Sequence, residues 1–217
     1  MTTEKMNVHR ALSELKVLDD RISDAINRTH FCTAAKHSAT KLDGMSLSDY
    51  KENTKSNYQK TMDLIRRRDA LKRAVVNSNA ETKVYVAGET MTVAEAIDKK
   101  NYGVSYLKSV LRRMSVDYEN AIRAIAQNSG DALEKRAEQF ILSMISAQPK
   151  DAKMSIDDDS MQKTREEYIK NNTYDLIDPI GIVKAMDDLR ETISDFESEV
   201  DAVLSTSNAV TEIEISY

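Results

Sequence analysis

One stretch of the sequence places apolar residues at alternating steps of four and three over three heptads. The positions are Ile182, Met186, Leu189, Ile193, Phe196, Val200 and Val203. This spacing is typical of a long helix whose apolar stripe packs against another helix, as in a coiled coil. Asp178 is a favourable helix cap, and Pro179 suits a first helical turn. We therefore expect a long helix that begins after Asp178 and ends at the Ser-Thr-Ser-Asn segment 205–208.

The composition agrees with a mostly helical chain. The 217 residues include 5 Gly, 2 Pro, 3 Phe and no Trp, whereas 31% of them are charged. A sandwich or a doubly wound fold would need more glycine at its turns. We expect a mostly α fold of long antiparallel helical hairpins, or a bundle, with coiled-coil-like packing and a small β-hairpin joined by a C-terminal strand.

We expect a single helical domain over residues 1–217. Residues 1–128 would form a helical hairpin with a β element. Residues 129–175 would form an insertion-like helix and a linker, and 176–217 the long helix with its C-terminal strand. Apolar spacing predicts further helices over 3–28, 93–127, 132–147 and 160–172. Another helix would begin at Ser46 or Ser48, after a polar loop over 29–45, and Asp131 would cap the helix over 132–147.

The pattern Ser-Asn-Ala-x-Thr, followed by alternating β-branched residues, occurs at 78–86 and again at 207–215. In each copy, Ser-Asn follows an amphipathic stretch, where Asn suits the end of a helix. After the first copy, Gly88 provides a turn at positive φ, and a second short strand follows. Thr92 and Glu95 have the spacing of a capping box. The sequence therefore predicts a β-hairpin over 82–93 that leads directly into a helix.

We expect the second copy to join this hairpin in one small sheet, because a lone two-stranded hairpin is marginal in water. Four alternate residues would cover one end of the helices: Val84, Val86, Ile213 and Ile215. Lys83 and Tyr85 would lie on the other face beside Glu212 and Glu214. Two alternatives remain open: a coincidence of sequence at two helix ends, and pairing of the tail with another subunit.

The segment VNSNAETKVYVAGETMTVAEAIDKKNYGVSYLKSVL resembles the central segment of the septicolysin-like family of helical proteins. The matching residues are Asn79, Thr82, Gly88, Thr92, Ala96 and Ile97. The resemblance covers roughly 65–115, and the segment over 129–175 departs from it. It implies a helical fold and a bacteriophage context, because similar sequences are frequent among phage proteins. It implies no particular activity.

Basic residues are concentrated just before the first copy of the repeat. They are Arg66, Arg67, Arg68, Lys72 and Arg73. Guanidinium groups suit phosphates and other anions, although such residues are also common on a solvated face paired with acids. Arg68 falls on the apolar stripe between Leu64 and Leu71. A buried arginine needs a carboxylate or a bound anion, so we expect Arg68 to point inward and to be a ligand-binding candidate.

A second basic group follows the hairpin. It contains Lys99, Lys100, Lys108, Arg112 and Arg113. Tyr102 and Tyr106 lie next to it and could stack on a base. If the helix that begins at Ser46 pairs antiparallel with the helix over 93–127, the two basic groups would share one groove. The sequence therefore predicts an anion-binding pocket between helices or between subunits.

Other chemical motifs are weak. His30, Cys32 and His37 lack a fourth ligand at standard zinc spacing, and nothing orders Cys32 and His37 as a nucleophile and base. The segment SIDDDS lacks the glycine and terminal glutamate of a calcium loop. No phosphate loop, nucleophile elbow or HExxH motif occurs. We expect no catalytic residues, no metal, no cofactor and no enzymatic activity.

Charge and hydropathy limit the partners. A net charge of −5 argues against general nucleic-acid binding, since phosphates must be neutralised by a basic surface. No apolar run of membrane-spanning length occurs, and the N-terminal residues do not form a signal peptide. The single cysteine fits a reducing compartment. We expect a cytoplasmic protein, in the host cytoplasm if phage-encoded, or a component of a virion.

Two classes of function remain. In the first, the chain is an oligomeric binding protein that sequesters a small anionic, nucleotide-like ligand. In the second, it is a structural or assembly component of a phage particle without a ligand. A homo-oligomer is expected in either class, because the helices offer more surface than one bundle covers. A ligand binder would leave its basic residues without acidic partners, whereas a structural protein would pair them across helices.

Overall fold

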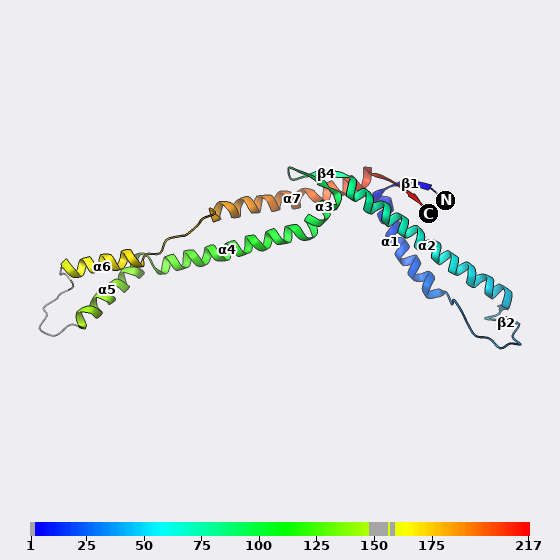
Figure 1. The fold of residues 1–217 in the computed structure, drawn as a ribbon, viewed down its shortest axis with the longest axis horizontal. Coiled ribbons are helices and arrows are strands. Elements are labelled where there is room, and N and C mark those ends of the chain that lie inside the picture. Colours follow the sequence, from blue (N-terminus) through cyan, green and yellow to red (C-terminus); the bar gives the residue numbers. More distant parts are fainter. Residues whose placement is uncertain (1–2, 148–155, 157–158) are drawn as a thin grey trace. The chain divides into compact units, whose positions relative to one another are not determined.

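A computed structural model describes residues 3–147, 156 and 159–217, and it is mostly α-helical with small antiparallel sheets (Figure 1). Contacts divide the chain into two units. The first contains the residues up to Gly103 together with Ser194–Tyr217, and the second contains Val104–Ile193. None of the helices in the described ranges is long and apolar enough to cross a membrane.

The first unit begins with strand β1 (Thr3–Asn7) and helix α1 (Val8–Arg28). A short hairpin of β2 (Lys41–Leu42) and β3 (Met45–Ser46) precedes helix α2 (Leu47–Glu81). Next come β4 (Lys83–Val86), β5 (Glu89–Thr92), helix α3 (Val93–Asp98) and a π-helical segment, η1 (Lys99–Gly103). The end of helix α7 (Ile182–Val210) and strand β6 (Glu212–Ser216) complete the unit.

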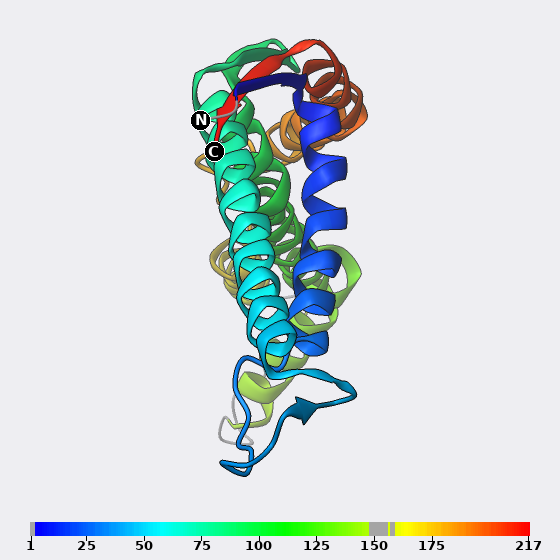
Figure 2. The same ribbon diagram turned by 90° about the vertical axis from the view of Figure 1, so that its right-hand side faces the viewer.

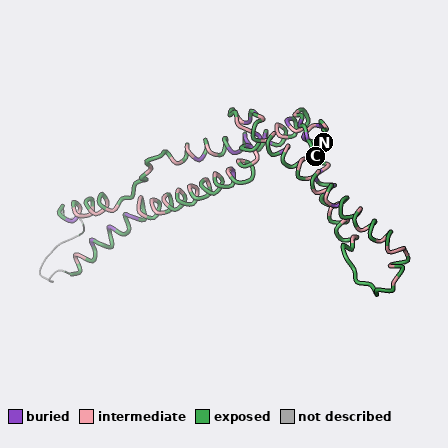
Figure 3. The backbone as a smooth tube through the Cα atoms, turned by 45° about the vertical axis from the view of Figure 1, so that its right-hand side comes forward, coloured by how far each residue is buried: buried purple, intermediate pink, exposed green. Residues whose placement is uncertain are grey.

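Helices α1 and α2 pack side by side and form the first hairpin (Figure 2). Their apolar stripes meet strands β1 and β6 in one core, and the buried positions gather towards these strands (Figure 3). The core residues are Met6, Val8, Ala11, Leu15, Leu18, Leu71, Val75, Ile213 and Ile215. The predicted helix over 3–28 is therefore correct from Val8 onward, but residues 3–7 form a strand. Asn7 ends that strand because its side chain accepts the Arg10 N–H at 2.9 Å and caps α1.

The small sheet predicted from 82–93 and the C-terminal strand is wrong in its pairing. Strand β6 pairs with β1, with Glu214 opposite Lys5, whereas β4 and β5 form a separate two-stranded sheet. The expected alternation is confirmed, because Val84, Val86, Ile213 and Ile215 are all buried. Glu214 therefore meets Lys5, at 3.6 Å, and not Lys83.

The hairpin and the capping box are confirmed. Gly88 has a φ of 81°, and Ala87 before it has a φ of 49°. The Thr92 hydroxyl accepts the Glu95 N–H at 3.2 Å, and the Glu95 carboxylate accepts the Thr92 N–H at 2.7 Å. The Thr92 N–H and hydroxyl both donate to the Glu95 carboxylate, and these two hydrogen bonds lower the pKa of Glu95 below its ordinary value. The turn thus leads into α3 through a complete capping box.

The two copies of the repeat lie in equivalent places, at the C-terminal ends of α2 and α7. The Ser78 carbonyl accepts the Thr82 N–H at 2.8 Å, and the Ser207 carbonyl accepts the Thr211 N–H at 2.9 Å. Each Ser-Asn-Ala is therefore the last turn of its helix, and each Thr is the first residue outside it. Helix α7 consequently continues to Val210 and does not end at 205–208 as predicted.

The second unit contains α4 (Val104–Gln127), α5 (Gly130–Ser146), α6 (Asp159–Asn172) and the start of α7. Helices α5 and α6 pack together, and Phe140 stacks on Tyr168 with ring centroids 4.7 Å apart. Asp131 does not cap α5, because Ser129 occupies the cap position and makes no side-chain bond there. Asp178 does accept the Ile182 N–H, at 2.8 Å, but Pro179 lies before the helix and not in its first turn.

Candidate functional site

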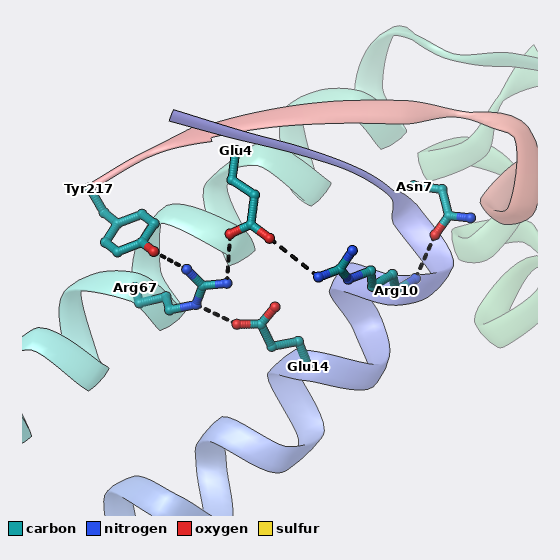
Figure 4. Close-up of polar contacts among 6 residues, drawn as sticks. All are labelled: Glu4, Asn7, Arg10, Glu14, Arg67 and Tyr217. Carbon is teal, nitrogen blue, oxygen red and sulfur yellow. Dashed lines mark hydrogen bonds and ion pairs between the residues drawn. The ribbon is translucent and has the colours of Figure 1, made fainter. Parts of the chain in front are cut away.

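Arg67 of α2 is the centre of the densest polar network described in the first unit (Figure 4). Its Nε donates to the Glu14 carboxylate of α1, and its Nη2 donates to Glu4 Oε2 of β1 at 2.9 Å. Its Nη1 donates to the Tyr217 hydroxyl, and the guanidinium carbon lies 4.7 Å from the centre of the Tyr217 ring. One side chain thus joins α2 to α1, to β1 and to the residue that follows β6.

The Arg67 network is largely shielded from solvent. The side chains of Arg67, Glu4 and Glu14 are 19%, 29% and 23% exposed. Glu4 also accepts from Arg10 at 3.4 Å, so its second oxygen is satisfied. The hydrogen bond to Glu14 is the main cause that raises the pKa of Arg67 above its ordinary value, followed among the raising causes by that to Glu4, whereas burial opposes the shift. Arg67 therefore stays charged, and its charge is neutralised within the protein.

The inward-pointing arginine predicted at position 68 is instead Arg67. Arg68 is 37% exposed and donates to Asp19 of α1 at 2.6 Å and to Asp69 at 3.5 Å. From Leu64 to Leu71, a stripe can step through either 67 or 68 with alternating steps of three and four. Position 67 lies on the side of α2 that faces β1 and Glu14, so its side chain becomes half-buried.

Three other predicted site residues are also paired with carboxylates. Arg66 contacts Asp63 at 3.2 Å, within the same helix. Lys99 contacts Glu89 at 2.6 Å and lies 4.9 Å from the centre of the Phe196 ring. Lys100 donates to Asp201 of α7.

The remaining candidates are exposed. Lys72 and Arg73 are neighbours on the outer surface of α2, and within the described part of the chain they form no ion pair. Tyr102 and Tyr106 are also exposed, as is Arg112. Tyr106 and Arg112 belong to α4, in the second unit.

The predicted groove depended on an antiparallel pairing of the helix that begins at Ser46 with the helix over 93–127. Within the first unit, helix α2 packs along α1, and it also contacts α3. Two hollows of the first unit lie away from the basic candidates. One is lined by Val84, Val203 and Val210, and the other by Phe31, Leu47 and Tyr50.

The weak metal motif also fails to gather ligands. Cys32 is exposed in the segment between α1 and β2, and among the described residues no cluster of His, Cys, Asp and Glu could hold a metal ion. Part of the SIDDDS segment, including Asp157 and Asp158, lies outside the described residues.

Comparisons with protein-family models, with curated proteins and with solved structures found no match for this chain.

Sequence reasoning missed the carboxylates that surround Arg67. Glu4 and Glu14 are ordinary charged residues in the sequence, and their role comes from the pairing of β1 with β6. One signal was present: Glu14 lies next to Leu15 of the buried stripe, at the edge where a helix commonly places charges that reach a neighbouring helix.

Replacing Arg67 with Met is expected to destabilise the first unit by about 2 kcal/mol. Removing one partner of a buried ion pair costs about 3–5 kcal/mol, and partial solvation of Glu4 and Glu14 reduces this cost. The measurement is urea unfolding followed by circular dichroism. Arg68→Met is the matched control and should cost clearly less than Arg67→Met, because that pair is more exposed. Equal effects of the two substitutions would contradict the central role of Arg67.

Proposed function

We propose that this protein is a non-catalytic structural component that acts through protein–protein contacts of its helices. One observation supports this most directly: Arg67, the half-buried arginine of the basic stretch, is neutralised by carboxylates from two other elements, Glu4 of β1 and Glu14 of α1. An incoming phosphate would have to displace these carboxylates and leave them unpaired. The arginine-rich stretch is therefore better explained as a clamp between elements than as a ligand site.

Exposed apolar side chains support the same proposal. In the second unit, Ile177 is 86% exposed and Ile180 is 64% exposed, and both lie in the irregular segment before α7. Tyr106 and Val110 lie one helical turn apart on α4 and are also exposed. Exposed apolar groups that lie close together are typical of surfaces that contact another protein. The resemblance to septicolysin-like sequences leads us to propose a phage particle as the setting, with assembly in the host cytoplasm.

Anion binding is a second candidate function, and it has its own observation. Lys72 and Arg73 are adjacent, exposed and without an ion pair in the described ranges. Two such cations could contact a phosphate of a nucleotide-like ligand, and a homo-oligomer could supply the other side of the pocket. This candidate requires a partner surface, because one exposed helix face does not enclose a ligand.

A thermal-shift experiment against a panel of nucleotides separates the two candidates, with light scattering to measure mass. For a structural component we expect no shift of the melting temperature at millimolar nucleotide. A shift of several degrees that is lost in Lys72→Gln/Arg73→Gln, but kept in Arg66→Gln, would support the anion binder and contradict the structural proposal. Arg66 is a suitable control because it is also exposed and is already paired with Asp63.

A further inference from the structure

The first unit is assembled from two halves of the chain that have the same order of elements. Residues 3–86 contribute strand β1, helices α1 and α2, and strand β4. Residues 89–216 contribute β5, α3, the end of α7 and β6. Two strand pairs join the halves, β1 with β6 and β4 with β5, whereas the short strands β2 and β3 pair with each other within the first half. Neither half can therefore complete the β1–β6 and β4–β5 sheets alone.

The correspondence extends to individual hydrogen bonds. The Thr82 carbonyl accepts the N–H of Val93, the first residue of α3, at 2.9 Å. The Thr211 carbonyl accepts the N–H of Val8, the first residue of α1, at 3.0 Å. Each helix is capped by the side chain of the preceding residue, Asn7 or Thr92. The two junctions are thus built by the same contacts, each joining one half to the other.

The side chains around the junctions also correspond. Val8 and Val93 are buried at the two helix starts, and one turn later Ala11 and Ala96 are buried. Arg67 and Phe196 precede the Ser-Asn-Ala of their halves by the same number of residues, and Glu14 and Lys99 follow the cap residues of their halves by the same number. Arg67 pairs with Glu14 in one half, and Phe196 contacts Lys99 in the other. One contact is an ion pair and the other a cation–π contact. In both cases the contact joins a long helix to the helical segment that follows a paired strand.

Only the turn at Ala87 and Gly88 connects the halves along the chain. Both residues have positive φ, which suits Gly88 but is unfavourable for Ala87 because of its Cβ. The turn is held closed by Glu199 of α7, whose carboxylate accepts the Ala87 N–H at 2.7 Å. Opening this turn would relieve the strain at Ala87 and let β4 continue directly into β5.

From these contacts we infer that two copies of this chain form a dimer by exchanging halves, with Ala87–Gly88 as the hinge. In the dimer, residues 3–86 of one copy pair with residues 89–216 of the other. Both strand pairs, the hydrogen bonds of Val8 and Val93 to the Thr211 and Thr82 carbonyls, and the contact of Arg67 with Tyr217 form again between chains. The two helix caps and the ion pairs of Arg67 stay within each half, as in the monomer. Short, strained hinges favour such exchange, because opening the hinge relieves the strain. The exchanged form also loses no contacts except those of the turn. This dimer does not depend on the proposed structural role.

Deleting Ala87 and Gly88 tests the exchange in the full chain. Without the turn, β4 cannot fold back on β5 of the same copy, so only the exchanged dimer keeps both strand pairs. We expect light scattering to show a doubling of the 24.5 kDa monomer mass with unchanged helical circular dichroism. Ala87→Asn is the opposite control, because Asn tolerates positive φ, and it should lower the dimer fraction of the concentrated protein. A monomeric or an unfolded deletion variant would overturn the inference.

A disulfide experiment shows whether the dimer forms by exchange. One variant carries Lys5→Cys and the other carries Glu214→Cys, and both also carry Cys32→Ser. Positions 5 and 214 lie directly opposite each other in the β1–β6 pair. The two variants are unfolded together, refolded at high concentration and oxidised. Exchange is expected to give a disulfide between the two different chains, and dilution before oxidation should reduce its yield several-fold. Absence of the mixed disulfide at high concentration would sink the inference even if a dimer is observed.

Discussion

A chain that stops at Thr211 is expected to lose the folded structure of the first unit. This truncation removes Ile213 and Ile215, which are 7% and 2% exposed, and it leaves β1 without a partner. Burial of each isoleucine contributes about 1.5–3 kcal/mol, so the two together contribute about 3–6 kcal/mol before any strand pairing is counted. Such a loss is comparable with the whole stability of a typical domain, which is about 5–15 kcal/mol.

The truncation is measured by thermal unfolding and by limited proteolysis within α1 and α2. We expect a lower melting temperature and rapid cleavage of the α1–α2 hairpin, because this hairpin shares its core with β6. Removal of Tyr217 alone is the control. It deletes the hydrogen bond and the ring contact of Tyr217 with Arg67 but keeps β6, so its effect should be about 1 kcal/mol or less. An unchanged melting temperature of the longer truncation would show that β6 does not support this core.

Local patterns in the sequence predicted the elements well, but they did not predict which strands pair. The stripe over 182–203, the hairpin turn at Gly88 and the capping box at Thr92 each depend on residues close together in sequence. Alternation also showed which face of β6 is buried. The partner of β6 could not be predicted in this way, because β1 has the sequence Thr-Glu-Lys-Met-Asn and only one β-branched residue. Its strand conformation comes from pairing with β6 and not from its own propensity.

In the candidate site, too, local sequence patterns did not predict which residues contact each other. Steps of three and four allow both Arg67 and Arg68 on one stripe, and only the position of β1 and α1 decides between them. Glu4 lies far from Arg67 in sequence, so no local spacing connects the two residues. The basic character of the stretch was predictable, whereas its neutralisation depends on tertiary contacts.

Replacing Phe196 with Ala is expected to destabilise the first unit by about 3–5 kcal/mol. Phe196 is 1% exposed, and it has one of the largest fully buried side chains in the described structure. Truncation removes its apolar contacts and leaves a cavity that the surrounding helices fill only in part. It also removes the ring that Lys99 contacts, a cation–π interaction that contributes about 0.5–2 kcal/mol. Urea unfolding followed by circular dichroism provides the measurement.

The comparison with Arg67 also predicts which of the two substitutions destabilises the first unit more. Phe196 and Arg67 hold corresponding places in the two halves, but one contact is a buried ring and the other a partly solvated ion-pair network. Because solvent can partly compensate unpaired carboxylates but cannot fill an apolar cavity favourably, Phe196→Ala should cost more than Arg67→Met. Val210→Ala, on the exposed end of the same helix, should change stability by less than about 0.5 kcal/mol. A cost for Phe196→Ala no larger than that of Val210→Ala would mean that α7 does not pack into the first unit through this ring.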